Sequence, residues 1–534
     1  MSEDGIMSDE PEANGGAPKM DGGTAEADGG TATATATASA TDLLDSNVTP
    51  PKTDPISQFK HFGPGILLMM TGVGTSHIIT IPTAGGRFGW ALLWAIPVAY
   101  AFKWYGFRMA YRFTYATGKS IMDAMNTTKR KWALWYVLIV FGAQMTIGQA
   151  GRLIAAAAVL FFGLNSITGL LSVPLWGYAV AIGGLSVAVI LTGRYRAVEL
   201  TVKSILVVVV LAFVAVYFVS PPEASAYINF FVIDVPPEAW LVFAASIGLL
   251  PTGIDVSLQA SEWGLAKKKG LPRLRDEIEA EGAANEIDKF EDDPSIEDFT
   301  VDYDQLSDRT REYCYRWFRI GVRDFDYSNV LSLLLAIMIM SLAVVWMFPS
   351  DVEGQQAIGE IAQIFTESVG PWMMAVFLLG AFGIAFSTQF NYFDGRPRVI
   401  SAACRNLFRG VDSWSGVESA PDGAGRVWYS EYNIYRGSMI VSFIGAVVII
   451  AGVPEPVFVV LVASALAAVI APVIFFFNFW FCLRAIPEDS EFYPSRWEIY
   501  FTWLSLGVFT FLVGLSLLAM FDLIHIFVPG VEPN

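Results

Sequence analysis

Two apolar stretches of this 534-residue chain are interrupted near their middle by glycine or proline followed by polar residues. The first interruption reads Gly-Val-Gly-Thr-Ser-His and ends at His77, and the second reads Gly-Leu-Leu-Pro-Thr-Gly-Ile-Asp and ends at Asp255. An imidazole can bind a metal ion or titrate near neutral pH. A carboxylate removed from water needs a cation, a hydrogen bond or a proton. His77 and Asp255 are therefore the first candidates for contact with a cation.

The interruptions also offer oxygen ligands. A break in a membrane helix frees backbone carbonyl and amide groups, which are tolerated only when they are buried in protein or face a cavity. The predicted substrate- or metal-binding residues are Gly74, Thr75, His77, Leu250, Thr252 and Asp255, with His77 and Asp255 as metal ligands. The alternatives are a structural histidine, hydroxyls that only join helices, and glycines and prolines that only kink them.

A second set of polar residues lies in other apolar stretches. Gln144 and Arg152 fall in one of them, and Glu199 opens another. Ionisable residues in membrane spans are rare, usually pair with one another and mark functional pathways. We predict that Arg152 pairs with Glu199 or Asp255.

The composition predicts that membrane-spanning helices position these residues. The chain is 54% hydrophobic and 16% charged, with a mean hydropathy of +0.49, whereas soluble domains carry about 25% charged residues. The values exclude a soluble enzyme, a secreted disulfide scaffold and a nucleic-acid-binding protein. The three cysteines are scattered and form no metal-binding motif.

Apolar blocks of about 20 residues can each cross a ~30 Å hydrocarbon core as a helix, and they predict an all-α integral membrane protein with eleven spans. The predicted spans are 62–84, 88–113, 133–162, 173–193, 197–219, 241–263, 329–348, 371–404, 432–452, 457–483 and 499–521. Lysines and arginines cluster on one side, including those from Arg396 to Arg436, and Arg87 is the exception. Positive residues mark the cytoplasmic side, so the N-terminus is predicted in the cytoplasm and the C-terminus outside a cell membrane.

Of the formal charge of −17, −14 lies in the tail at 1–60 and in a loop inserted at 264–328 into the predicted transmembrane domain at 61–523. Residues 1–60 hold eleven acids and three lysines, and their low-complexity composition predicts a disordered cytoplasmic tail. An inserted cytoplasmic loop at 264–328 holds seventeen acids and eleven bases. Its acidic stretch at 276–308 predicts a solvated, partly helical loop, with adaptation to high salt as the alternative. Residues 524–534 are a short extracellular tail.

Breaks at matching places five spans apart are typical of transporters built from two inverted repeats. The motifs at 63–65, 88–94, 116–119 and 249–251 read Gly-Pro-Gly, Phe-Gly-Trp-Ala-Leu-Leu-Trp, Ala-Thr-Gly-Lys and Leu-Leu-Pro. They resemble the Nramp divalent-metal transporters, over roughly residues 60–520. The resemblance implies a LeuT-like fold with broken helices 1 and 6, a substrate site between them and no enzymatic activity. It implies no cofactor beyond the transported cation, with H⁺ or Na⁺ as a coupling ion.

The chain departs from the family at the site itself. The family reads Asp-Pro-Gly-Asn in the first break, where this chain places Gly74 at the aspartate and His77 at the asparagine. The family reads Met-Pro-His in the sixth helix, where this chain has Leu250 and Thr252 around the proline. Without the thioether, oxygen ligands favour a harder or more hydrated ion. In the third span, Gln144 and Arg152 stand where the family places acidic residues of its proton route. The resemblance therefore implies a proton or charge pathway through Gln144, Arg152 and Glu199.

The sequence therefore predicts a secondary transporter that moves a divalent cation of the Mn, Fe or Mg kind across a lipid bilayer by alternating access. One alternative is a transporter of another small solute on the same scaffold, and another is a membrane sensor that does not transport. No G-x-x-x-x-G-K-[ST] motif is present, so ATP-driven pumping is unsupported. The predicted partners are the bilayer and a small inorganic cation, with no nucleic acid.

Overall fold

A computed structural model of the chain describes residues 42–44, 49–52, 54, 74–169, 171–192, 210–288, 290, 294–350, 357–411 and 429–521. All structural statements below concern these residues. Most of the predicted tail, the first half of the first predicted span, Glu199 and the C-terminal tail lie outside them.

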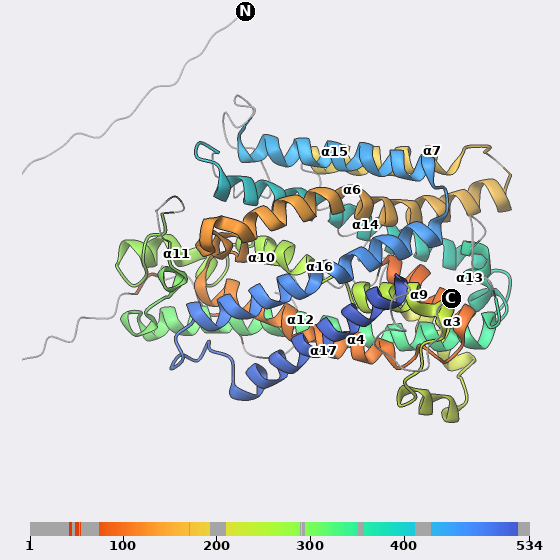
Figure 1. Cartoon of the computed structure of the whole chain (residues 1–534), viewed down its shortest axis with the longest axis horizontal. Helices are drawn as coiled ribbons and strands as arrows, with labels where there is room; N and C mark the ends of the chain where they lie inside the picture. Colours follow the sequence, from red (N-terminus) through yellow and green to blue (C-terminus); the bar gives the residue numbers. More distant parts are fainter. Residues whose placement is uncertain are drawn as a thin grey trace, which may run out of the picture. The chain divides into compact units, whose positions relative to one another are not determined.

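The described residues are helical, and their β-structure amounts to a single isolated bridge between Ala284 and Val301 (Figure 1). The α-helices are α3 (Ile81–Phe88), α4 (Ala95–Thr117), α5 (Ile121–Ala124), α6 (Trp132–Phe161), α7 (Leu175–Leu191), α9 (Trp240–Leu249), α10 (Val256–Ala266), α11 (Leu271–Ala280), α12 (Asp308–Met347), α13 (Ala357–Thr366), α14 (Met373–Leu407), α15 (Glu431–Gly452), α16 (Pro456–Ala485) and α17 (Arg496–Met520). The shorter elements are η1 (Ser76–Thr80), η2 (Met125–Thr127), η3 (Lys129–Lys131), η4 (Phe162–Ile167), η5 (Ala224–Phe230), η6 (Pro237–Ala239), η7 (Ile296–Phe299) and η8 (Tyr303–Gln305).

Six helices in the described part are long and apolar enough to cross a membrane, namely α6 with its flanking turns, α12, α14, α15, α16 and α17. Other predicted spans correspond to shorter apolar helices at Leu175–Leu191, Val210–Val219 and Pro237–Leu249. Helix α4 has 23 residues but carries Lys103, Arg108 and Arg112. The fold is thus a multi-span helical membrane protein, and the total of eleven spans remains a prediction.

The first two predicted spans have different boundaries in the structure. Gly89 follows α3 with φ +59°, a left-handed conformation that favours glycine, and its N–H donates to the Gly85 carbonyl. Residues 89–94 then form turns, and α4 begins at Ala95 instead of Phe88. The predicted span at 88–113 missed this because the turn residues are themselves apolar.

Helix α6 packs against α14, α16, α15 and α7, while α4 packs against α12, α16, α17 and α10 (Figure 1). Small residues permit the closest approaches, as in other membrane bundles. A Cβ on Gly151 of α6 would lie 2.8 Å from Cβ of Ala463 on α16. Helix α15 leaves Val441, Ile444 and Val448 exposed, as expected of an apolar face that meets lipid. These two groups of helices position the polar residues described below.

The acidic segment after α10 is packed against the helices. It contains α11, and α12 begins at Asp308, twenty residues before the predicted end of the loop. Arg275 of α11 is buried and donates to the carbonyl of Thr117 at the end of α4. The Tyr303 hydroxyl donates to the neighbouring Ala116 carbonyl, and burial raises the pKa of this tyrosine. The segment therefore caps α4, although much of its acidic surface faces outward.

Candidate functional site

The second sequence interruption is a break in regular helix. Helix α9 ends at Leu249 and α10 begins at Val256, and residues 250–255 between them are not helical. Leu250, Thr252 and Asp255 are all buried. The Leu250 N–H still donates to Ser246 in α9, but the buried Thr252 hydroxyl has no hydrogen-bond partner among the described residues. The break thus places one carboxylate and one unpartnered hydroxyl inside the protein.

Lys103 of α4 reaches into this break. Its ammonium group donates to the carbonyl oxygens of Gly248, at 3.1 Å, and Thr252, at 3.0 Å, and its side chain is fully buried. The last carbonyls of a helix lack partners within the helix and carry partial negative charge. The Lys103 ammonium therefore donates hydrogen bonds to one carbonyl in the last turn of α9 and to one in the break.

Asp255 forms an ion pair with Arg396 of α14, and both side chains are buried. The Arg396 guanidinium also lies 4.2 Å from the ring centre of Phe141 and 4.7 Å from that of Tyr392. Apart from the ion pair, no hydrogen bond among the described residues reaches either charged group. The predicted partner of Asp255, Arg152, is not its partner here. Arg396, which the sequence places among the cytoplasmic arginines at the end of the predicted span 371–404, is fully buried within α14.

Arg152 is held in α6 by a hydrogen bond to the Gly148 carbonyl, 2.8 Å long. Its guanidinium lies 3.9 Å from the ring centre of Tyr392, so Tyr392 contacts both Arg152 and Arg396. The Tyr392 hydroxyl donates to the Gln144 carbonyl at 3.3 Å. The structure therefore brings Gln144 and Arg152 together around Tyr392. The predicted third member, Glu199, lies outside the described residues.

Five residues from four elements form this site, which we call the break cluster: Lys103, Arg152, Asp255, Tyr392 and Arg396. Three of them are basic and one is acidic. The break cluster therefore carries more positive than negative charge from the protein itself, and Arg396 is the base that pairs with Asp255.

The first sequence interruption has different polar partners. The His77 ring contacts the Ser76 hydroxyl at 3.1 Å through Nδ1, and through Nε2 the Tyr100 hydroxyl at 3.2 Å and the Ser332 carbonyl at 3.3 Å. The Gly74 carbonyl accepts hydrogen bonds from the backbone N–H groups of residues 77 and 78. Thr75 is also buried. The Gly74 carbonyl therefore accepts the first backbone hydrogen bonds of the helical segment that begins at Ser76.

A cavity of about 10 Å³ lies beside His77, lined mainly by apolar residues such as Phe213 and Phe365. This is room for about one water molecule. No group of three or more His, Cys, Asp or Glu side chains in the described ranges is placed to hold a metal ion. The shared metal site of His77 and Asp255 remains a prediction, and any cation site here needs hydroxyl and carbonyl oxygens.

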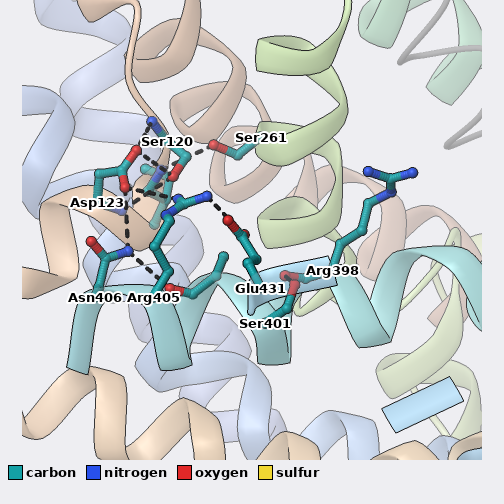
Figure 2. A network of polar contacts seen from close by, with 10 residues as sticks. Ser120, Asp123, Ser261, Arg398, Ser401, Arg405, Asn406 and Glu431 are labelled. Carbon is teal, nitrogen blue, oxygen red and sulfur yellow. Dashed lines mark hydrogen bonds and ion pairs between the residues drawn. The ribbon is translucent and has the colours of Figure 1, made fainter. Parts of the chain in front are cut away.

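A second polar cluster lies where α14 ends, shown in Figure 2. Arg405 donates to the carboxylates of Glu431, at 2.9 Å, and Asp123, at 3.0 Å. Asn406 donates to the same oxygen of Asp123, and Ser120 donates to the other through its backbone N–H and its hydroxyl. We call these five residues the terminal network. It ties the end of α14 to α5 and α15.

A cavity of about 300 Å³ opens beside the terminal network. Its charged lining includes Lys119, Asp123, Glu262, Arg398, Arg405 and Glu431. Glu262 lies on α10, so this cavity borders the helix that begins directly after the break.

Sequence reasoning missed Lys103, Tyr392 and Arg396. Lys103 and Arg396 both fall within predicted spans, at 88–113 and 371–404, where a basic residue is itself a signal of function. Tyr392 carries no comparable signal, because an aromatic residue in an apolar helix is ordinary.

Comparison with known proteins matches residues 65–519 to the family described as natural resistance-associated macrophage protein-like, or Nramp. An uncharacterized protein of Pasteurella multocida is 24% identical over 358 residues, which is 64% of this chain and 70% of that protein. Crystal structures of the Eremococcus coleocola manganese transporter, one a mutant and one in complex with an aromatic bis-isothiourea substituted compound, align with a TM-score of 0.54 over 92% of this chain and 93% of theirs. At 13% and 15% identity they show a shared fold. Since the family match covers most of the sequence, this chain belongs to the Nramp family, whose members are transporters and not enzymes.

Proposed function

We propose that the chain is a secondary transporter that carries a divalent metal ion across a lipid bilayer by alternating access, with its cation site at the break in residues 250–255. Family membership and the structural likeness to a manganese transporter support this class of cargo. In this proposal residues 74–80 and 250–255 are the interrupted segments of helices 1 and 6 in two inverted five-helix repeats.

The observation that carries the proposal is the buried ion pair between Asp255 and Arg396. Burying a lone carboxylate is strongly unfavourable, and a guanidinium partner offsets part of that cost. Apart from this ion pair, no backbone or side-chain group among the described residues donates a hydrogen bond to the Asp255 carboxylate. A cation that reaches Asp255 therefore has to displace one partner and not a network.

In this mechanism the divalent ion takes the place of Arg396 at Asp255. A divalent ion interacts with the carboxylate twice as strongly as a guanidinium at the same distance, whereas a monovalent ion has no such advantage. The unpartnered Thr252 hydroxyl supplies a second oxygen ligand. Carboxylate and hydroxyl oxygens suit hard ions such as Mg²⁺ and Mn²⁺.

When the ion leaves, Arg396 returns to Asp255 and neutralises it. The empty site can then reorient without carrying an unpaired charge through the membrane, which would be costly. Arg152 and Arg396 share the ring of Tyr392, so Tyr392 gives the displaced guanidinium an aromatic face to rest on. These residues together supply the return step of the alternating-access cycle.

A second candidate function is transport of a small anionic solute. It is favoured by the excess of buried bases in the break cluster, because Lys103, Arg152 and Arg396 accompany the single carboxylate of Asp255. The negative charge of a bound anion, added to that of Asp255, would bring the net charge of the break cluster closer to zero.

The test is flux into proteoliposomes, with Mn²⁺, Mg²⁺, Ca²⁺ and small carboxylates offered in turn and a pH-sensitive dye inside. We expect uptake of a divalent ion that falls at least about 100-fold in Asp255→Asn. The matched control is Asp304→Asn. Asp304 is an exposed carboxylate that pairs with Arg311 and lies outside the break cluster. Divalent uptake that survives Asp255→Asn would contradict the site, and uptake of carboxylates alone would establish the second function.

A further inference from the structure

We propose that the Lys103 ammonium group is a tethered cation that permanently fills a monovalent-cation site at the end of α9. The chain then carries, as a side chain, the positive charge that a dissolved coupling ion would otherwise bring. The site consists of the carbonyl oxygens of Gly248 and Thr252, which accept hydrogen bonds of 3.1 and 3.0 Å from Lys103.

The first argument is the nature of the two oxygens. Gly248 lies in the last turn of α9 and Thr252 lies in the break, so neither carbonyl is followed by continuous helix that could supply an N–H partner. Carbonyls at the C-terminal end of a half-helix carry the negative end of its dipole. In transporters with broken helices, such carbonyls coordinate Na⁺ or H⁺.

The second argument is the burial of Lys103 without an acidic partner. Its side chain is fully buried, and no carboxylate in the described ranges lies within ion-pair distance of it. Nearby it has the ring of Phe509, 6.0 Å away. Since no carboxylate in the part of the chain that the structure describes pairs with the ammonium, its contacts there are the carbonyls of Gly248 and Thr252.

The third argument is that the carbonyl site is held between two helices. A Cβ on Gly248 would lie 2.3 Å from the carbonyl oxygen of Ser464, so α9 approaches α16 too closely for any side chain on that face. Lys103 reaches the same residue from α4. Gly248 is thus fixed against α16, and Lys103 reaches its carbonyl from α4.

This assignment concerns the fold of the break and holds whichever cargo is carried. Its consequence for coupling rests on the proposed function: a transporter whose site is already filled by Lys103 needs no Na⁺ or K⁺ there. Metal flux by the unaltered chain should then be independent of the alkali cation in the buffer.

The test is chemical rescue of thermal stability in detergent, which requires no transport. Lys103→Ala removes the cation and leaves space, while Lys103→Met fills the space without a charge. We expect both variants to have a lower Tm than the unaltered protein. Millimolar propylammonium should restore at least half of the lost Tm in Lys103→Ala and none in Lys103→Met. Tetramethylammonium, which lacks N–H donors and is bulkier, controls for ionic strength. A Tm of Lys103→Ala that does not respond to propylammonium would overturn the assignment.

Lys103→Gln decides the question where the alanine variant does not fold. An amide can donate hydrogen bonds to the same carbonyls but carries no charge. A loss of Tm in Lys103→Gln as large as in Lys103→Met shows that the carbonyls require a cation and supports the proposal. A Lys103→Gln protein as stable as the unaltered one shows that a neutral donor suffices and overturns it.

A flux experiment separates this inference from the proposed function. Replacing Na⁺ and K⁺ by choline should leave metal flux unchanged in the unaltered chain and reduce it severalfold in Lys103→Ala. If no metal is transported by any variant, the proposed function fails, while the rescue of Tm still tests Lys103.

Discussion

The terminal network and the break cluster are both buried clusters of charge, but they differ in how their charges are paired. In the terminal network, Arg405 bonds to Asp123 and Glu431, and the Asp123 carboxylate also accepts from Ser120 and Asn406 (Figure 2). In the break cluster, Asp255 has a single ionic partner and no hydrogen bond from the described residues.

The difference separates a structural role from a binding role. The Asp123 and Glu431 carboxylates accept hydrogen bonds, although Nε of Arg405 and Oδ1 of Asn406 have no partner among the described residues, whereas neither oxygen of Asp255 accepts one. A carboxylate held by several donors makes its neighbourhood rigid, whereas one without donors is open to a ligand. The terminal network joins helix ends, and the break cluster lies at an interrupted helix with an unpartnered hydroxyl on Thr252. We therefore expect substitutions in the first to affect stability and those in the second to affect ligand binding.

The largest expected effect is on stability, in Arg405→Met. Removing this guanidinium leaves Asp123 and Glu431 buried without their common partner, which should lower the free energy of unfolding by about 3–5 kcal/mol. The measurement is thermal or denaturant unfolding in detergent. Arg316→Met is the matched control, because Arg316 pairs with Glu312 at the surface and its loss should cost about 1 kcal/mol or less. Equal losses in the two variants would show that the network is not the anchor proposed here.

A double substitution in the break cluster should have a smaller effect than either of its single substitutions. Asp255→Leu and Arg396→Met each leave one buried charge unpaired, at a cost of about 3 kcal/mol, while the double variant removes both charges and should be close to the unaltered protein in stability. Unfolding free energies of the four proteins measure the coupling. Additive losses would mean that the two side chains do not act as a pair. The double variant should be stable and yet fail to transport.

Gly148→Ala should have an intermediate effect. The new Cβ would lie 2.3 Å from the Tyr392 hydroxyl and 3.3 Å from Arg152, so the ring between the two arginines must move. Overpacking of this kind costs about 1–3 kcal/mol, measured as a fall in unfolding free energy. Gly142→Ala, on the same helix with open space at its Cβ, is the control and should change little. A Gly148→Ala protein of normal stability would show that Tyr392 is not fixed in place.

The smallest expected effect is that of Thr252→Val. The hydroxyl has no hydrogen-bond partner in the described part of the chain, so its replacement by a methyl group should change the unfolding free energy by less than about 1 kcal/mol. Because the hydroxyl is a proposed ligand, the affinity for the divalent ion should fall severalfold, measured by titration calorimetry. An unchanged affinity would remove Thr252 from the site.

The sequence alone predicts the helical membrane class and the family, and its second interruption coincides with the non-helical residues 250–255. The apolar blocks and the motifs at 88–94 and 249–251 carry this information, since span length and turn chemistry are local. The boundaries are less predictable: α12 begins at Asp308 within a charged segment because buried residues such as Trp317 and Phe318 pack one face of it against the bundle.

The partners within the site could not be predicted. Asp255 is visible in the sequence as a buried charge, but its pairing with Arg396 depends on the packing of α10 against α14, which no local pattern encodes. The position of Arg396 near a cytoplasmic helix end also suggested a solvated residue. Lys103 bonds to backbone carbonyl groups, which every residue type has, so the sequence gives no sign of this contact.

The most direct test of the account is the affinity of the purified protein for a divalent ion with and without Arg396. If the metal ion and the guanidinium compete for Asp255, Arg396→Gln should bind Mn²⁺ or Mg²⁺ at least about tenfold more tightly than the unaltered chain, or 1.4 kcal/mol in binding free energy. Arg316→Gln at the surface should leave that affinity unchanged. An Arg396→Gln protein that binds the divalent ion no more tightly than the unaltered chain would contradict the exchange of partners at Asp255.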